Sequence, residues 1–454
     1  MSLENTTIFG PATLVGDSGI TVIRVSGKDS FSIVSKVFSA SMAELTRIDL
    51  TQFKNHSAHH GYIFDGNVLV DEAVITIYKA PGSYTGEDVI EISTHGGSYI
   101  YKIISGLLSK LGARHSEPGE FSKRAYLNGK MDLVQAEAVA DLIRAQTDKA
   151  NKLALKQLSG EFSSKIKELK DDLINYCSLL ELELDFAEEG IDLVSRKDLL
   201  QKIESLISRF EQITGSYQSG KIIQHGVNLA IVGRPNVGKS SIFNYLLKEN
   251  RAIVSHIPGT TRDYLQEPLI MGGIKFNVID TAGIRKTLDI IEREGVRRTE
   301  MKIEESDIVL EVEDLTRPNL TADEYVIGVS NDKIIKVFNK SDIVHGNGSK
   351  GFSISALTGD NMHELQEKIV EKARSLIIDA ESTDIIITNQ RHRDCLLKSC
   401  EYLVNAKNQI ISGGGNELIS FEIRAAMDAL SEITGKVTNV DILNNIFAKF
   451  CIGK

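Results

Sequence analysis

The sequence predicts a multidomain protein of mixed α/β and α class, because the hydrophobic pattern changes type along the chain. Residues 1–118 alternate short β-like segments with glycine turns and helical stretches, which indicates an α+β domain. Residues 119–220 and 379–454 carry apolar residues at three- and four-residue steps, which is typical of long helices. Between them, residues 221–378 repeat strand and helix, which predicts an inserted, doubly wound, mainly parallel sheet.

Composition and charge limit the kinds of function. A chain of 454 residues and 50.0 kDa exceeds one ordinary core, and its net charge of −10 excludes a surface that is basic throughout. Contact with a nucleic acid therefore requires a local patch. No apolar run approaches the roughly 20 residues that cross a bilayer, and no secretory signal opens the chain, so we expect a cytoplasmic protein without a membrane span.

The four cysteines form neither a disulfide framework nor a metal-binding spacing, so reduced, buried thiols are expected. They are Cys177, Cys395, Cys400 and Cys451.

In the first domain we expect strands at 21–25, 60–63, 67–78 and 89–93 and a helix at 99–111. Residues 83–88, together with Glu91 and residues 94–97, carry more functional side chains than a structural loop needs. Gly96 and Gly97 can equally form the turn into the helix.

In the inserted domain we expect strands at 227–232, 274–279, 308–312, 334–338 and 352–354. Glu311 and Glu313 depart from the apolar pattern of a buried parallel strand. Burying them is costly, so we expect this strand to lie near a sheet edge or to be irregular.

A glycine loop, residues 233–240, follows the strand at 227–232 and precedes a helix. Gly233 and Gly238 let backbone N–H groups converge on a phosphate chain, and the helix adds its positive end. Lys239 would reach the β- and γ-phosphates, and the Ser240 hydroxyl would bind Mg²⁺.

Two later segments suit the same phosphates. The Asp280 carboxylate can hold Mg²⁺ through water, and the Gly283 N–H can meet the γ-phosphate. Thr260 and Thr261 supply hydroxyls suited to sensing the metal and the phosphate.

Two more segments suit a guanine base. Asp342 can accept both the N1–H and the exocyclic amine of guanine, which adenine does not offer, and the segment Ser355-Ala356 can present a backbone N–H to O6. Taken singly, these motifs can also be a turn, a helix cap and a helix start. Together and in this order, the five resemble GTPases of the translation-factor-like class, which implies GTP binding and hydrolysis. The implied nucleotide-binding residues are Asn236, Val237, Gly238, Lys239, Ser240, Ser241, Thr260, Thr261, Asp280, Gly283, Asn339, Lys340, Asp342, Ser355 and Ala356, with Mg²⁺ at Ser240, Thr261 and Asp280.

The position after Gly283 lacks a water-orienting group. Ras-like enzymes place a glutamine there, whereas this chain has Ile284, which cannot polarise water. Another group must therefore orient the attacking water for hydrolysis, and the segment 288–295 offers carboxylates. Asn236 offers a neutral oxygen where a monovalent cation can lie beside the phosphates.

The whole chain resembles the MnmE (TrmE) family of tRNA-modifying GTPases. The resemblance rests on the inserted domain and on the segments Thr85-Gly86-Glu87-Asp88, Pro118-Gly119-Glu120-Phe121-Ser122, Asn128-Gly129-Lys130-Met131-Asp132-Leu133 and Phe450-Cys451-Ile452-Gly453-Lys454. It implies a homodimer that binds 5-formyl- or 5,10-methylenetetrahydrofolate. It also implies a partner, the FAD-containing subunit MnmG (GidA), and a substrate, tRNA, whose wobble uridine U34 receives an aminomethyl or carboxymethylaminomethyl group at carbon 5.

The resemblance also assigns site residues. Folate would contact Arg24, Glu91, Lys130 and Lys454, although Arg24 and Lys130 taken alone can be solvated surface charges. GTP hydrolysis would be stimulated by K⁺, held by Asn236, Ser255, Ile257 and Thr260. The implied catalytic residues are Glu292, which would position water, with Lys239, Thr261 and Gly283; Cys451 would be a catalytic thiol or would shape the folate pocket.

Two other functions stay open at this point. One is a GTP-switched, RNA-binding assembly factor without modification chemistry of its own. The other is a stand-alone folate aminomethyl transferase with a regulatory domain.

Overall fold

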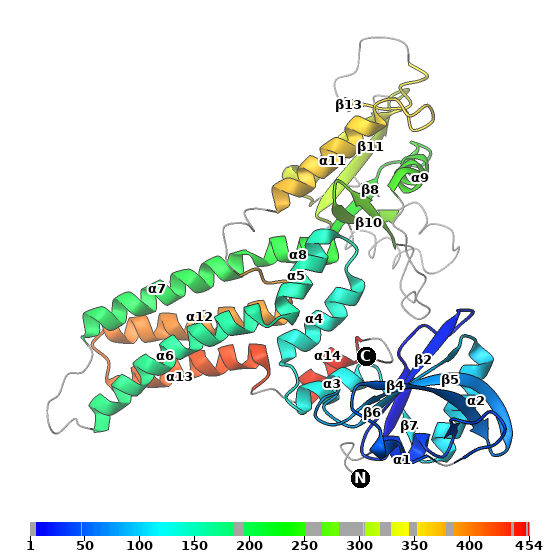
Figure 1. Cartoon of the computed structure of the whole chain (residues 1–454). Helices are drawn as coiled ribbons and strands as arrows, with labels where there is room; N and C mark the ends of the chain where they lie inside the picture. Colours follow the sequence, from blue (N-terminus) through cyan, green and yellow to red (C-terminus); the bar gives the residue numbers. More distant parts are fainter. Residues whose placement is uncertain are drawn as a thin grey trace, which may run out of the picture. The chain divides into compact units, whose positions relative to one another are not determined.

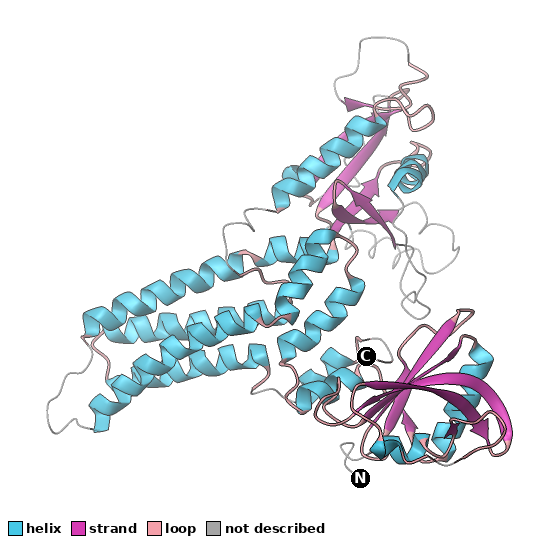
Figure 2. Ribbon diagram, in the orientation of Figure 1, coloured by secondary structure: helices cyan, strands magenta, loops and turns pink. Residues whose placement is uncertain are grey.

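The computed structural model describes residues 6–46, 48–185, 195–250, 266–280, 303, 305–317, 328–344, 352–377, 385–436, 440–450 and 453. The chain divides into two compact units (Figure 1; Figure 2). The first comprises residues 1–140, 157–164 and 431–454, and the second comprises 141–156 and 165–430. Within the described ranges, no helix combines the length and the apolar character needed to cross a membrane.

A seven-stranded sheet forms the centre of the first unit, as the alternating pattern predicts. The strand order is β3-β4-β5-β6-β2-β1-β7, and each pair is antiparallel except β1 with β7. The strands are β1 (Ile8–Pro11), β2 (Ile20–Ser26), β3 (Phe38–Ser39), β4 (Ser57–Asp65), β5 (Val68–Tyr78), β6 (Val89–His95) and β7 (Arg114–His115). The predicted strands and the helix at 99–111 are confirmed.

Helices α1 (Ser30–Val34) and α2 (Ser98–Lys110) cover one face of this sheet (Figure 1). Ile23 and Ile92 point into that core and are fully buried. Because successive side chains on a strand alternate between faces, Arg24 and Glu91 lie on the opposite face. A turn at Gly97 leads into α2, so that interpretation is confirmed.

The C-terminal segment packs on the first unit through α14 (Val440–Phe447), which contacts α3 (Glu120–Leu127). Phe447 and Phe450 are buried with Leu133 in one apolar cluster. Gly119 adopts a φ of +69°, and a side chain there would collide with the Phe447 backbone. The end of the chain is therefore part of the first unit.

Long helices form much of the second unit, as the three- and four-residue periodicity predicts. Besides α3 and α14, the helices of the two helical segments are α4 (Leu133–Arg144), α5 (Asp148–Leu158), α6 (Glu161–Asp185), α7 (Arg196–Gly215), α8 (Tyr217–His225), α12 (Gln390–Ile411) and α13 (Asn416–Thr434). Helices α7 and α12 lie side by side (Figure 2). The Ser399 hydroxyl of α12 donates to the Ala426 carbonyl of α13 (2.9 Å). Cys177 and Cys395 are buried thiols outside any disulfide, as expected, whereas Cys400 is half-buried.

A six-stranded sheet forms the inserted domain, in the order β13-β12-β11-β8-β10-β9. Only β9 runs antiparallel to its neighbour among the described strands. The strands are β8 (Val227–Val232), β9 (Gln266–Met271), β10 (Ile274–Asp280), β11 (Ile308–Asp314), β12 (Ile334–Asn339) and β13 (Phe352–Ser353), with helices α9 (Lys239–Asn250) and α11 (Met362–Leu376). The predicted parallel sheet is confirmed, and it brings the carboxyl ends of β8, β11 and β12 to one edge.

The expectation that the strand with Glu311 and Glu313 lies near an edge or is irregular is wrong. Strand β11 pairs regularly with both β12 and β8, and the two glutamates are only 3% and 4% exposed. Lys336 on β12 lies opposite Glu311 in the strand register. Its Nζ lies 2.8 Å from Glu313 and 3.7 Å from Glu311, so a cation from the next strand offsets the buried charge.

We expect Lys336→Met to destabilise the inserted domain, because it removes a cation from two buried carboxylates. Breaking a buried ion pair costs about 3–5 kcal/mol, and Lys336 is 40% exposed, so the lower end of that range applies. Hydrogen exchange of β11 and β12 measures the effect. The triple variant Lys336→Met, Glu311→Leu, Glu313→Val should recover most of the loss, and equal protection in Lys336→Met and the parent chain would contradict this account.

Candidate functional site

The glycine loop has the strand, loop and helix order that the sequence predicts. Strand β8 ends at Val232, and α9 begins at Lys239. Gly233 and Gly238 have φ of +146° and +100°, and side chains there would collide with the Val312 carbonyl and the Asn339 amide. Since both glycines are required by space as well as by conformation, the loop is closely built against β11 and β12.

The Lys239 ammonium is folded over this loop. Its Nζ donates to the carbonyl oxygens of Gly233 (2.7 Å) and Arg234 (2.8 Å), and the residue is 8% exposed. Ser240 and Ser241 in the first turn of α9 are exposed, as is Asn236, which has a left-handed φ of +65°. These groups leave hydroxyl and amide oxygens available at the start of the helix.

The Asn339 side chain joins the loop to the distant Ser355-Ala356 segment. Its Nδ2 donates to the Val237 carbonyl (2.8 Å), and its Oδ1 accepts from the Ala356 N–H (3.0 Å). The residue is 3% exposed, so both contacts are protected from water. Nearby, the Ser355 hydroxyl donates to the Asp342 carboxylate (2.6 Å). Residues more than a hundred positions apart therefore meet at one edge of the sheet.

Part of the predicted nucleotide site lies outside the described residues: Ser255, Ile257, Thr260, Thr261, Gly283 and Glu292. Asp280 ends β10, where its backbone pairs with Ile231 of β8, and its side chain is not among the described groups.

Asp314, at the end of β11, was not assigned a role from the sequence. Its carboxylate forms an ion pair with Lys340 (2.6 Å). A signal was available: an acidic residue that ends a parallel strand lies at the same edge as the loops that follow the neighbouring strands.

A second group of predicted residues meets in the first unit. The Arg24 guanidinium donates twice to the Glu91 carboxylate, at 2.9 and 2.7 Å, and the two residues are direct partners across β2 and β6. Arg24 also lies over the rings of Tyr84 (5.0 Å) and Phe121 (5.6 Å). At 12% side-chain exposure, it is not a solvated surface charge.

The C-terminal segment reaches the same place. The Gly453 carbonyl accepts from Arg24 Nη1 (3.5 Å), and Gly453 is buried with a φ of +96°. Cys451 and Lys454 lie outside the described residues. Lys130 is exposed, and its Nζ donates to the Pro81 carbonyl (2.9 Å), in the loop that carries Tyr84. The structure thus brings Arg24, Glu91 and Gly453 together and places the Lys130 ammonium against the loop that carries Tyr84.

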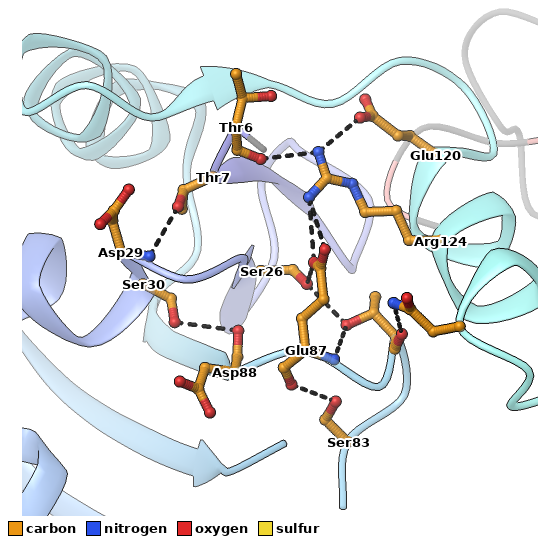
Figure 3. Close-up of polar contacts among 12 residues, drawn as sticks. Thr6, Thr7, Ser26, Asp29, Ser30, Ser83, Glu87, Asp88, Glu120 and Arg124 are labelled. Atoms are coloured by element: carbon orange, nitrogen blue, oxygen red, sulfur yellow. Dashed lines mark hydrogen bonds and ion pairs between the residues drawn. The ribbon is translucent and has the colours of Figure 1, made fainter. Parts of the chain in front are cut away.

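A buried arginine ties this loop to α3 (Figure 3). Arg124 donates to both oxygens of Glu87 (3.1 Å each), to Glu120 (3.0 Å) and to the Thr6 carbonyl (2.8 Å). Ser26, two residues after Arg24, donates to Glu87 (2.7 Å). The cavity beside them measures ≈ 270 Å³. The loop that carries Tyr84 is therefore held in place by charge-assisted bonds.

Two comparisons with known proteins place the chain. The protein-family model described as GTP-binding protein TrmE N-terminus matches residues 7–130. The family model described as MnmE helical domain matches residues 133–451. The chain belongs to the MnmE family of tRNA modification GTPases. The tRNA modification GTPase MnmE of Aquifex aeolicus is 42% identical over 98% of this chain and 99% of its own. MnmE proteins of Flavobacterium psychrophilum (40%, 99% of each chain) and Chlorobium phaeobacteroides (39%, 98% of this chain and 96% of its own) are similar at comparable length.

In this MnmE-family chain, Glu120 is a buried carboxylate bonded to two arginines and a backbone N–H. Burial alone would raise the pKa of Glu120, but bonds from Arg114, the Glu117 N–H and Arg124 outweigh it and lower the pKa. A carboxyl with a lowered folded pKa stabilises the fold fully above its unfolded value, and this stability is lost as pH falls.

We therefore expect hydrogen-exchange protection in residues 1–140 to fall below about pH 4.3, the ordinary value for glutamate. Glu120→Gln should show a weaker dependence on pH than the parent chain, each compared at matched pH. Glu117→Gln, which changes an exposed carboxylate beside it, serves as the control. Identical pH profiles for Glu120→Gln and the parent chain would remove Glu120 as the cause.

Proposed function

We propose that the chain is the GTP-hydrolysing subunit of an enzyme that modifies carbon 5 of wobble uridine U34 in tRNA. It would install an aminomethyl or carboxymethylaminomethyl group, use 5-formyl- or 5,10-methylenetetrahydrofolate, and act with the FAD-containing subunit MnmG (GidA). The observation that carries the proposal is the meeting of Arg24, Glu91 and Gly453 in a chain that also holds the nucleotide-binding loop.

We assign the phosphate end of GTP to the glycine loop. Lys239 already lies over the loop, so its ammonium needs only to exchange two carbonyl contacts for phosphate oxygens. The exposed Ser240 hydroxyl at the start of α9 fits a Mg²⁺ ligand, with Asp280 and Thr261 completing the set, and Mg²⁺ there would neutralise phosphate charge.

We assign the guanine end to Asn339, Lys340, Asp342 and Ala356. The buried Asn339 amide fixes the Ala356 segment relative to the loop, so the base and the phosphates are held at a set separation. The Ser355 hydroxyl orients the Asp342 carboxylate that would accept from the base.

We assign the folate to the Arg24 face of the first unit. The Arg24 Nη1 atom makes one long contact, at 3.5 Å, which leaves it able to donate to a carboxylate, and two aromatic rings lie beside it. Lys130 and Lys454 would add positive charge for the carboxylate tail. Cys451, two residues before Gly453, would lie near the reacting carbon or shape the pocket.

The same sheet face supports a homodimer. Ile20 and Val74 share the face of Arg24 and are 62% and 38% exposed, which favours a partner that covers them. We also propose a cytoplasmic location, which the reduced state of Cys177, Cys395 and Cys400 supports.

Calorimetric titration of the full chain with 5-formyltetrahydrofolate tests the folate site. Arg24→Met should weaken binding about 10- to 100-fold, because it removes a charge-assisted hydrogen bond worth about 1.5–3 kcal/mol. Lys36→Met, which changes an exposed cation elsewhere in the first unit, is the matched control. Absence of folate binding by the parent chain would instead favour the GTP-switched assembly factor.

Hydrolysis is tested at Glu292, the proposed water-positioning carboxylate. Because Ile284 replaces glutamine, we expect Glu292→Ala to lose about 10²–10⁴ in GTPase rate while binding a slowly hydrolysed GTP analogue normally. Glu294→Ala is the control from the same segment. The parent rate should be higher in K⁺ than in Na⁺, since Asn236, Ser255, Ile257 and Thr260 would hold K⁺. Near-normal turnover by Glu292→Ala would remove it from the mechanism.

A further inference from the structure

The ammonium of Lys340 is fixed by a carboxylate from another strand. Asp314 ends β11, and its Oδ2 lies 2.6 Å from Lys340 Nζ. The side chain of Asp314 is 13% exposed and that of Lys340 is 30% exposed. An ion pair this close and this shielded from water is held more firmly than a pair on the surface.

The second oxygen of the Asp314 carboxylate is also occupied. Oδ1 accepts from the Thr316 N–H (2.9 Å) and from the Thr316 hydroxyl (2.6 Å). Burial alone would raise the pKa of Asp314, but the bonds from Lys340 and Thr316 outweigh it and lower the pKa, so the group is anionic at neutral pH. Both oxygens of the Asp314 carboxylate are therefore bonded, which fixes its orientation toward Lys340.

The backbone around Lys340 ties the pair to the base site. Asp314 and Asn339 are direct partners in the register of β11 and β12, and the Leu315 N–H donates to the Asn339 carbonyl (3.0 Å). Lys340 itself adopts a left-handed φ of +72°, which is uncommon for a residue other than glycine. Since its ammonium is paired with Asp314 and its side chain is 30% exposed, Lys340 can offer its apolar four-carbon stem as a contact surface.

We propose that Asp314 is a positioning residue for guanine-nucleotide recognition: it anchors the Lys340 ammonium so that the apolar stem forms a fixed wall for the face of the purine ring. This inference rests on the proposed assignment of residues 339–342 to the base. A contact with the ring face does not depend on the exocyclic groups of the base, whereas Asp342 reads those groups directly. The two residues should therefore affect different properties of binding.

The test measures the Kd of the full chain for GDP and for IDP, which lacks the exocyclic amine. Asp314→Asn should weaken both nucleotides about tenfold, as expected for the loss of one charge-assisted contact, with the GDP-to-IDP ratio preserved. In GTP hydrolysis, KM should rise more than kcat falls. Asp332→Asn, at the opposite end of β12, is the control and should leave both Kd values unchanged.

A double-mutant cycle separates positioning from general stability. Lys340→Met keeps the stem and removes the ammonium, so adding Asp314→Asn to it should cause no further loss of affinity. Losses that add in the double variant, or a Kd for Asp314→Asn within twofold of the parent, would overturn the proposal. Asp342→Asn should reduce the preference for GDP over IDP, so that the ratio of the GDP Kd to the IDP Kd rises toward one; an unchanged ratio would refute the base assignment itself, separately from the role of Asp314.

Discussion

The buried amide of Asn339 is the contact on which the nucleotide side of the molecule depends. Its donor and its acceptor bind two loops that are far apart in sequence, one between β8 and α9 and the other after β13. Loss of either partner would leave a buried donor or acceptor unpaired, which costs about 1–3 kcal/mol of folding free energy. Both loops must therefore stay in place for the amide to be satisfied. This arrangement requires glycine at position 238, because a side chain there would collide with the Asn339 amide.

The first unit uses charge in a similar way. Arg24 and Arg124 are both nearly buried: Arg24 pairs with Glu91 of the neighbouring strand, and Arg124 pairs with Glu120 of its own helix and with Glu87 from a distant loop. Because these pairs are shielded from water, they fix a strand, a loop and a helix in one arrangement. Gly453 adds a carbonyl contact to Arg24, so residues more than four hundred positions apart meet beside this strand.

The sequence predicted elements whose physics is local. The glycine loop depends on conformations that only glycine adopts easily, and the helices and strands of the first unit depend on periodicity, so both were predictable. Contacts between strands were not. Glu311 and Glu313 suggested an edge strand because the sequence does not show that Lys336 faces them. No role was predicted for Asp314, because its contact with Lys340 depends on the pairing of β11 with β12, which the sequence does not show. Which residues of the nucleotide and folate sites act together depends on the same kind of long-range contact.

The charges inside the sheet also bear on how the chain finds its fold. In a parallel pair of strands that are apolar on both faces, the hydrophobic pattern alone does not distinguish the native register from one shifted by a residue. Strands β11 and β12 lack that freedom: a slip of one residue would turn Lys336 to the other face and leave Glu311 and Glu313 among apolar side chains. The ion pairs of Lys336 therefore favour the native register of β11 and β12, because a shifted register would leave two buried carboxylates without a cation.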